Sequence, residues 1–243
     1  MRAPFSTVTD DALADHDMVG LLAELAAGRV HPNELFAAAW ERAEHAEPLN
    51  AVVSWVPPST SVDGPFAGIP TFVKDDEEVQ GVATTNGSRA VPDTPAEEDS
   101  PFAQQLRQLG LAFVGKSALP EFGLMPTTEP LAHGPTRNPW DLSRSTGGSS
   151  GGAAALVAAG VVPIATGNDG GGSIRIPASC CGVVGLKPSR NRLQPTAEAE
   201  ILPLDIITYG VHTRSVRDTA AFYREIEKIH CELPPIGDVV GPG

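Results

Sequence analysis

Apolar and polar residues recur at helical spacing over the first part of the chain. The pattern runs from residue 11 to 27, and Gly28 follows it where a helix C-cap is expected. Pro32 opens a second helical pattern, which stops before Pro48. The sequence therefore predicts two consecutive helices before its first strand.

Short apolar runs alternate with helical patterns over the rest of the chain. The predicted strands span residues 51–56, 69–73, 111–114, 161–165 and 183–186, and the predicted helices span residues 102–109, 152–159 and 215–229. A long loop is expected over residues 125–146, and Ser215 to Asp218 has the form of a capping box. Strands separated by helices predict an α/β fold, with a mixed β-sheet core, some parallel pairing and flanking helices.

Charge and composition exclude several classes of partner. The 243 residues include 17 Lys and Arg against 30 Asp and Glu, a formal net charge of −13. Such an acidic surface repels phosphate backbones and anionic bilayers, so we expect neither nucleic acid nor membrane as a partner. The chain also has 25 Gly and 23 Pro, which predict many tight loops, where catalytic residues often lie.

Cysteine usage and the N-terminal residues favour a cytoplasmic protein. Cys180, Cys181 and Cys231 are odd in number and lack metal-ligand spacing, as expected of free thiols in a reducing compartment. The first twenty residues do not have the pattern of a signal peptide. Nor does any run approach the roughly 18 apolar residues of a membrane span.

Two glycine-serine segments lie where flexible linkers are not expected. Residues 147–152 read Gly-Gly-Ser-Ser-Gly-Gly and lead directly into an alanine-rich helical pattern. Residues 170–173 read Gly-Gly-Gly-Ser and lie between a predicted strand and the apolar residues 174–177. Glycines in such places let the backbone approach another group and present its N–H donors.

Lys74 ends an apolar strand pattern instead of lying on a polar face. A lysine there can simply extend its ammonium to solvent. In a dry setting, however, a lysine loses its proton more easily and can act as a base. Together with serines from the two glycine segments, Lys74 would form a set of nucleophile, relay and base.

These segments resemble the amidase signature family over residues 22–229. The matching residues are 68–75, 138–140, 147–152, 172–177 and 181–188. The resemblance implies a Ser-Ser-Lys triad that hydrolyses carboxamides. Lys74 would be the base, Ser149 the bridging serine on a cis peptide, and Ser173 the nucleophile.

The resemblance also implies a mechanism without metal or cofactor. Ser173 would attack the amide carbonyl of a small-molecule substrate, and water would hydrolyse the acyl-enzyme to carboxylate and ammonia or amine. Backbone N–H groups of Gly170, Gly171 and Gly172 would form the oxyanion hole. The supporting residues would be Ser150, Asp169 and Arg175, although the last two could equally form a plain structural ion pair.

Two features depart from the family pattern. Asn168-Asp169-Gly170 stands where members usually have Thr-Asp followed by an apolar residue or threonine. Members also run considerably further, so we expect a single domain over residues 1–243 that is incomplete at its C-terminus. Residues 1–56 would supply the N-terminal helices and first strand, residues 64–229 the core, and residues 230–243 an irregular tail. Such a chain would be a candidate for homo-oligomerisation or for association with the missing portion.

Other functions remain open on the sequence alone. An aminoacyl-tRNA amidotransferase A subunit would share the triad but work with partner subunits, and a third possibility is a non-catalytic fragment. Residues 110–117 also match a phosphate-binding loop, but their inner residues are apolar and indicate a buried strand. Residues 147–151 match a nucleophile elbow without the strand that should precede it. Its histidine candidates, His212 and His230, are expected at the surface or at a helix end.

Overall fold

A six-stranded mixed sheet forms the centre of the computed structural model, which describes residues 3–58, 63–196 and 206–230. The strands are β1 (Val52–Trp55), β2 (Pro70–Lys74), β3 (Ala112–Ser117), β6 (Ile164–Asp169), β7 (Val184–Gly185) and β8 (Thr208–Thr213), in the order β1-β3-β2-β6-β8-β7. The β3-β2-β6 pairs are parallel and the remaining pairs are antiparallel. A separate two-stranded sheet pairs β4 (Arg137–Asn138) with β5 (Asp141–Ser145).

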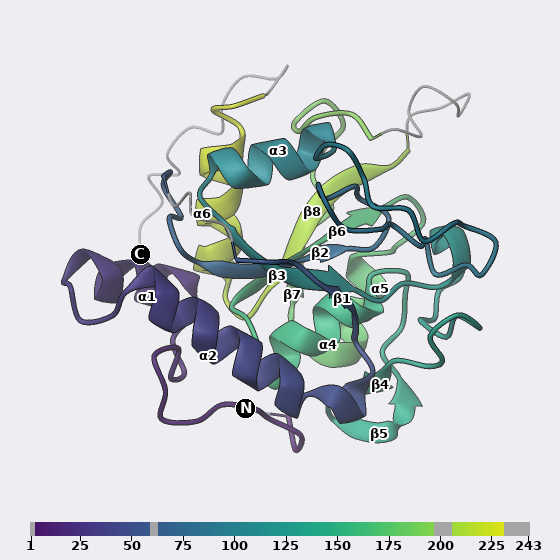
Figure 1. Cartoon of the computed structure of the whole chain (residues 1–243), viewed down its shortest axis with the longest axis horizontal. Helices are drawn as coiled ribbons and strands as arrows, with labels where there is room; N and C mark the ends of the chain where they lie inside the picture. Colours follow the sequence, from purple (N-terminus) through teal and green to yellow (C-terminus); the bar gives the residue numbers. More distant parts are fainter. Residues whose placement is uncertain (1–2, 59–62, 197–205, 231–243) are drawn as a thin grey trace, which may run out of the picture.

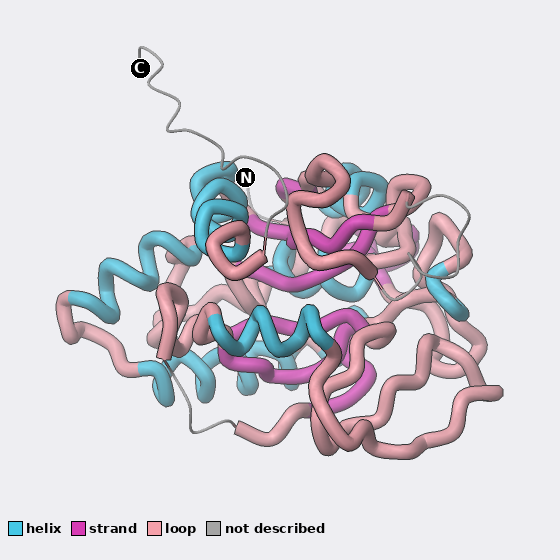
Figure 2. Tube along the Cα trace, turned by 90° about the horizontal axis from the view of Figure 1, so that it is seen from above, coloured by secondary structure: helices cyan, strands magenta, loops and turns pink. Residues whose placement is uncertain are grey.

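Helices cover both faces of the central sheet. They are α1 (Met18–Ala26), α2 (Pro32–His45), α3 (Pro101–Gln108), α4 (Gly151–Ala159), α5 (Arg175–Cys181) and α6 (Val216–Ile226), with 3-10 turns η1 (Glu47–Leu49) and η2 (Glu121–Gly123). Figure 1 shows α3 and α6 on one side of the sheet and α2, α4 and α5 on the other. Seen from above, long loops run around these layers (Figure 2). The predicted α/β class, a mixed sheet flanked by helices, is confirmed.

Burial on both faces explains why the central strands are short apolar runs. Every residue of β2 and of β6 is buried, as expected for parallel strands covered by helices on each side. The packing against α4 is especially close. A Cβ atom at Gly152 would lie only 2.4 Å from the backbone nitrogen of Ala118. Small residues in α4 therefore allow it to approach the chain that follows β3.

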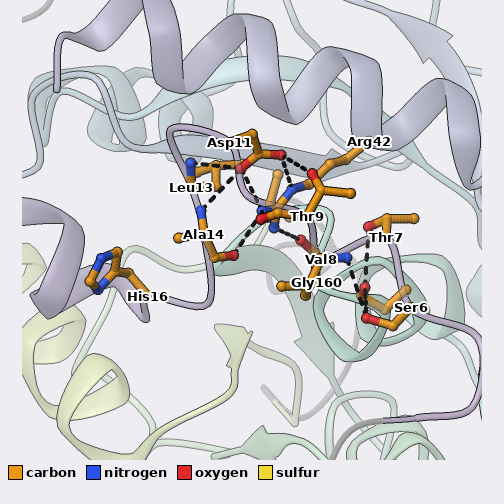
Figure 3. A network of polar contacts seen from close by, with 12 residues as sticks. Ser6, Thr7, Val8, Thr9, Asp11, Leu13, Ala14, His16, Arg42 and Gly160 are labelled. Atoms are coloured by element: carbon orange, nitrogen blue, oxygen red, sulfur yellow. Dashed lines mark hydrogen bonds and ion pairs between the residues drawn. The ribbon is translucent and has the colours of Figure 1, made fainter.

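A buried arginine attaches the N-terminal segment to the core (Figure 3). Arg42 of α2 is 2% exposed, and its guanidinium forms two hydrogen bonds with the Asp11 carboxylate. The same side chain donates to the carbonyl oxygens of Ala14 and Gly160. Because Gly160 follows α4, Arg42 joins the N-terminal segment, α2 and the end of α4 in one polar network.

The predicted capping box is only half present. Ser215 accepts a hydrogen bond from the Asp218 N–H, as a capping residue should. The Asp218 carboxylate, however, accepts from the backbone N–H groups of Met18 and Val19, at 2.9 Å each. It therefore caps α1 rather than its own helix and ties the two helices together.

Several predicted boundaries differ from the structure. The first helix begins at Met18 instead of residue 11, because Asp17 accepts from the Gly20 N–H and caps it there. The predicted loop over residues 125–146 contains the β4-β5 sheet, and β8 was not predicted at all. Cys231 and the rest of the predicted tail lie outside the described residues. Among the helices described, none is long and apolar enough to cross a membrane.

Candidate active site

Two neighbouring parallel strands bring the predicted site residues to one edge of the sheet. Lys74 ends β2, and Asn168 and Asp169 end β6, which pairs with β2. In α/β sheets, ligands usually bind outside the carboxyl ends of the strands. Lys74 is only 1% exposed, so its amine does not extend into solvent as a strand-end lysine could.

The Lys74 amine contacts the first serine of the glycine-serine segment. Its Nζ lies 2.9 Å from Ser149 Oγ, and Ser149 is itself 1% exposed. The peptide bond between Gly148 and Ser149 is cis, and α4 begins two residues after Ser149. The structure thus joins a lysine and a serine that are 75 positions apart in the chain.

The glycines around Ser149 are required by close packing. A Cβ atom at Gly148 would lie 2.3 Å from the Thr127 carbonyl oxygen, and one at Gly151 would lie 2.3 Å from Thr128 Oγ1. The Thr128 hydroxyl donates to the Gly147 carbonyl and accepts from the Gly151 N–H. Residues 147–152 are therefore a rigidly packed turn, and the expectation that they are not a linker is confirmed.

Ser173 lies beside this turn and is partly open to solvent. The Ser150 N–H donates to the Ser173 carbonyl at 3.1 Å, which connects the two glycine-serine segments. Ser173 is half-buried, whereas Ser150 is fully buried. Within the described ranges, no hydrogen bond joins the Ser149 and Ser173 hydroxyl groups. Lys74 and Ser149 are thus in direct contact, and Ser173 is attached to the same turn through its backbone.

Asp169 organises the loop that carries Ser173. Its carboxylate accepts from the backbone N–H groups of Gly172, Ile174 and Arg175, and the Arg175 guanidinium donates to both of its oxygens at 2.8 and 2.9 Å. Burial alone would raise the pKa of Asp169. The hydrogen bonds from Arg175 and from the Ile174 and Arg175 backbone outweigh this and lower the pKa to about 2. Asp169 and Arg175 therefore form an ion pair and also hold the loop, which combines the two alternatives of a structural ion pair and a supporting role.

One of the expected oxyanion donors is already occupied. The Gly172 N–H donates to Asp169 at 2.8 Å, so its expected place in the oxyanion hole is wrong in this conformation. The reason is that the Asp169 carboxylate is buried directly beneath the loop. The Gly170 carbonyl accepts from Lys187 Nζ at 2.8 Å. Among the described residues, the N–H groups of Gly170, Gly171 and Ser173 have no acceptor.

Two polar residues at the site were not identified from the sequence. Asp76 Oδ2 lies 3.1 Å from Lys74 Nζ, and Asn168 Oδ1 lies 2.5 Å from the same atom. Asn168 was noted only as a departure from the family pattern. Asp76 belongs to the acidic run 75–78, which on its own is typical of a solvated surface. The sequence feature that could have identified Asp76 is its position two residues after Lys74, the lysine that ends an apolar strand pattern.

The competing motifs have structural roles. Residues 112–117 form β3 and not a phosphate loop, and Lys116 is fully buried in an ion pair with Asp75. His212 was expected at the surface or at a helix end, but it is fully buried in β8 because that strand lies inside the sheet. Burial lowers the pKa of His212 to about 4, and its Nε2 lies 3.0 Å from the Ile174 carbonyl oxygen. His133, in the loop between β3 and β4, has its Nε2 3.1 Å from Thr85 Oγ1.

Sequence comparison identifies the family. The family model named Amidase matches residues 32–235. The protein named "Putative amidase AmiC" from Mycobacterium leprae (strain TN) is 48% identical over 243 residues, covering 96% of this chain and 52% of that protein. The 6-aminohexanoate-cyclic-dimer hydrolase of Paenarthrobacter ureafaciens is 43% identical over 209 residues, covering 80% of this chain and 42% of the hydrolase.

Solved structures agree with this result. A structure of 6-aminohexanoate cyclic dimer hydrolase matches with a TM-score of 0.80 at 36% identity, over 97% of this chain and 50% of that one. A bacterial aryl acylamidase matches with a TM-score of 0.81 at 30% identity, over 91% and 50% of the two chains. The chain therefore belongs to the amidase signature family of hydrolases. It spans about half the length of the curated relatives it matches.

Proposed function

We propose that this chain carries the catalytic centre of an amidase that hydrolyses a carboxylic acid amide through Lys74, Ser149 and Ser173. The observation that carries the proposal is the 2.9 Å contact between Lys74 Nζ and Ser149 Oγ, made where both side chains are excluded from water. An amine that faces a single hydroxyl in a buried setting is suited to accept its proton.

The reaction would proceed by covalent catalysis. Lys74 takes a proton from Ser149, and Ser149 takes one from Ser173, whose oxygen attacks the amide carbonyl. The proton then returns through Ser149 to the leaving amine, so that ammonia or an amine departs and an acyl-Ser173 ester remains. Water hydrolyses this ester to the carboxylate. Ser173 is suited to the nucleophile's role because it is the triad residue that solvent reaches.

The oxyanion of the tetrahedral intermediate would be bound by the backbone of the Ser173 loop. The N–H groups of Gly170, Gly171 and Ser173 are the donors that best fit this role, since they have no acceptor among the described residues. A well-placed donor of this kind contributes roughly 3–4 kcal/mol to transition-state stabilisation. Asp169 supports them indirectly, because it holds the next N–H groups along the loop.

The substrate class that we propose is a linear carboxamide, although relatives include a hydrolase of a cyclic dimer. We also infer a cytoplasmic location, because an odd number of cysteines without metal-ligand spacing is typical of free thiols in a reducing compartment. We propose that residues 1–243 form a single domain that associates with a second copy of the chain or with further family sequence.

Replacing the nucleophile tests the proposal. We expect Ser173→Ala to abolish hydrolysis of a chromogenic anilide and labelling by a fluorophosphonate probe, while the thermal unfolding midpoint is retained. Ser143→Ala is the matched control, because Ser143 is an exposed serine of β5. Labelling of the native chain at a residue other than Ser173, or undiminished turnover by Ser173→Ala, would contradict the proposal.

A further inference from the structure

Asp76 and Asn168 form a polar pair around the Lys74 amine. Asp76 Oδ2 lies 3.1 Å from Lys74 Nζ, and Asn168 Oδ1 lies 2.5 Å from it. Asn168 Nδ2 also donates to Asp76 Oδ2 at 2.9 Å. The three side chains therefore contact one another, and Ser149 is the third group that contacts the Lys74 amine.

The orientation of the Asn168 amide follows from Asp76. An ionised carboxylate only accepts hydrogen bonds, so the side of the amide that faces Asp76 must be its NH₂ group. The amide oxygen is then directed at Lys74, where it too can only accept. Asp76 thus contributes one acceptor itself and sets the direction of a second.

The number of hydrogens on Lys74 Nζ determines how Asp76 and Asn168 orient the amine. A neutral lysine has two N–H hydrogens and one lone pair at Nζ. Asp76 and Asn168 can accept only the two hydrogens, which leaves the lone pair for the Ser149 hydroxyl. When the amine takes the Ser149 proton, the resulting ammonium has three N–H groups and three acceptors within 3.1 Å. The proton that changes place is therefore the one between Lys74 and Ser149.

We propose that Asp76 and Asn168 are positioning residues that direct the Lys74 lone pair at Ser149. This inference rests on the proposed function, because it assigns a direction to the base of the triad. Each residue acts through Lys74 and need not touch the substrate. Their contribution is orientation of a reacting group, where a misplacement of about 1 Å can cost 10²-fold in rate.

The other charged groups near Lys74 are engaged elsewhere. Asp75 is paired with Lys116 at 2.8 Å, and Asp169 is paired with Arg175 at 2.8 Å, with Lys187 3.6 Å away. His212 is buried against the Ile174 carbonyl. Asp76, by contrast, has a second oxygen, Oδ1, that is buried and has no hydrogen-bond partner in the part of the chain that the structure describes. Asp76 is thus the carboxylate committed to Lys74 and Asn168.

The test measures the rate at which a fluorophosphonate labels Ser173, together with anilide hydrolysis, in the full chain. We expect Asp76→Ala and Asn168→Leu each to slow both reactions by about 10²-fold. Asp76→Asn should stay within several-fold of the native rate, because one amide oxygen can accept both hydrogen bonds that Oδ2 accepts. The double variant Asp76→Ala/Asn168→Leu should lose much less than the product of the single losses, because the pair acts as a unit.

Controls separate this inference from the proposed function. Asp141→Ala removes an exposed carboxylate of β5 and should keep the native rate, and thermal unfolding establishes that each variant is folded. If the native chain is not labelled at Ser173, the proposed function fails. If it is labelled and Asp76→Ala reacts as fast as the native chain, the inference alone is overturned.

The conservative variant tests how Asp76 acts. If Asp76→Asn loses as much of the rate as Asp76→Ala, Asp76 does not act by accepting hydrogen bonds, and the inference is overturned. Should Asp76→Ala not fold, a native rate in Asn168→Leu overturns the inference.

Discussion

The Lys116 ammonium lies 2.8 Å from the Asp75 carboxylate, and neither side chain has any exposure to solvent. Lys116 also donates to Thr84 Oγ1 at 2.6 Å and to the Ala83 carbonyl at 3.1 Å. Asp75 directly follows Lys74, so this ion pair fixes the turn that leaves β2. A second lysine, one strand away from Lys74, thereby holds the segment that follows the proposed base.

Removing Lys116 should therefore destabilise the fold severely. Lys116→Met leaves the Asp75 carboxylate buried without its cation, and breaking a buried pair in this way typically costs about 3–5 kcal/mol. Urea unfolding monitored by circular dichroism measures the loss. The matched control is Lys228→Met, because Lys228 forms an exposed pair with Glu225 and such pairs contribute at most about 1 kcal/mol. Equal effects of the two substitutions would contradict the assignment.

The depressed pKa of Asp169 predicts a pH-dependent contribution to stability. Its pKa is about 2 in the folded chain against an ordinary value of 3.8, so the contribution is complete above about pH 4 and is lost as the pH falls towards 2. We expect Asp169→Asn to be about 2 kcal/mol less stable than the native chain at pH 6, by the usual conversion of a pKa difference. The difference should shrink below pH 4.

Unfolding free energies measured from pH 6 to pH 2 test this prediction. Arg175→Gln serves as a second variant, since it removes the side chain that donates to both Asp169 oxygens. It should show part of the same loss over the same pH range. If the difference in unfolding free energy between the native chain and Asp169→Asn is the same at every pH, the carboxylate charge is not the cause of the lost stability.

Alanine should destabilise the fold at Gly152 and have almost no effect at Gly171. Gly152→Ala would place a methyl group 2.4 Å from the Ala118 nitrogen and 2.9 Å from the Ala51 carbonyl oxygen, where backbone must move. Overpacking of this kind costs about 1–3 kcal/mol, occasionally more. At Gly171 a Cβ atom would meet nothing within 4 Å, so Gly171→Ala should leave the unfolding midpoint nearly unchanged. The opposite ranking in thermal unfolding would contradict the described packing.

The adjacent thiols Cys180 and Cys181 should differ in reactivity. Cys181 is buried and Cys180 is exposed. Burial, with a smaller effect from Cys180, raises the pKa of Cys181 to about 12, so almost none of it is thiolate at pH 8. Iodoacetamide in the native state should therefore modify Cys180 and spare Cys181, as read by peptide mass spectrometry. In Cys180→Ser, Cys181 should become reactive only after denaturation. If Cys181 in the folded variant is modified as fast as Cys180 in the folded native chain, its burial is contradicted.

Local patterns in the sequence determined much of the architecture and most of the candidate site. The second helix, Pro32–His45, begins at the predicted proline and ends before Pro48. The buried strand that ends at Lys74 and the alanine-rich helix after the glycine-serine segment were also predicted, because periodicity and turn residues act over a few positions. The same local motifs carried the resemblance that named Lys74, Ser149 and Ser173.

Tertiary structure alone decided which distant groups meet. Asn168 contacts Asp76 across 92 positions, and Asp218 caps a helix 200 positions away, so no local pattern indicates either pairing. β8 has no continuous apolar run, yet it and His212 are buried, because β8 lies between β6 and β7 in the sheet and α4 and α6 pack against it. The sequence by itself determined the elements and the chemistry that they carry. Long-range packing determined the surroundings of each group, because burial and hydrogen-bond partners depend on residues that only folding brings together.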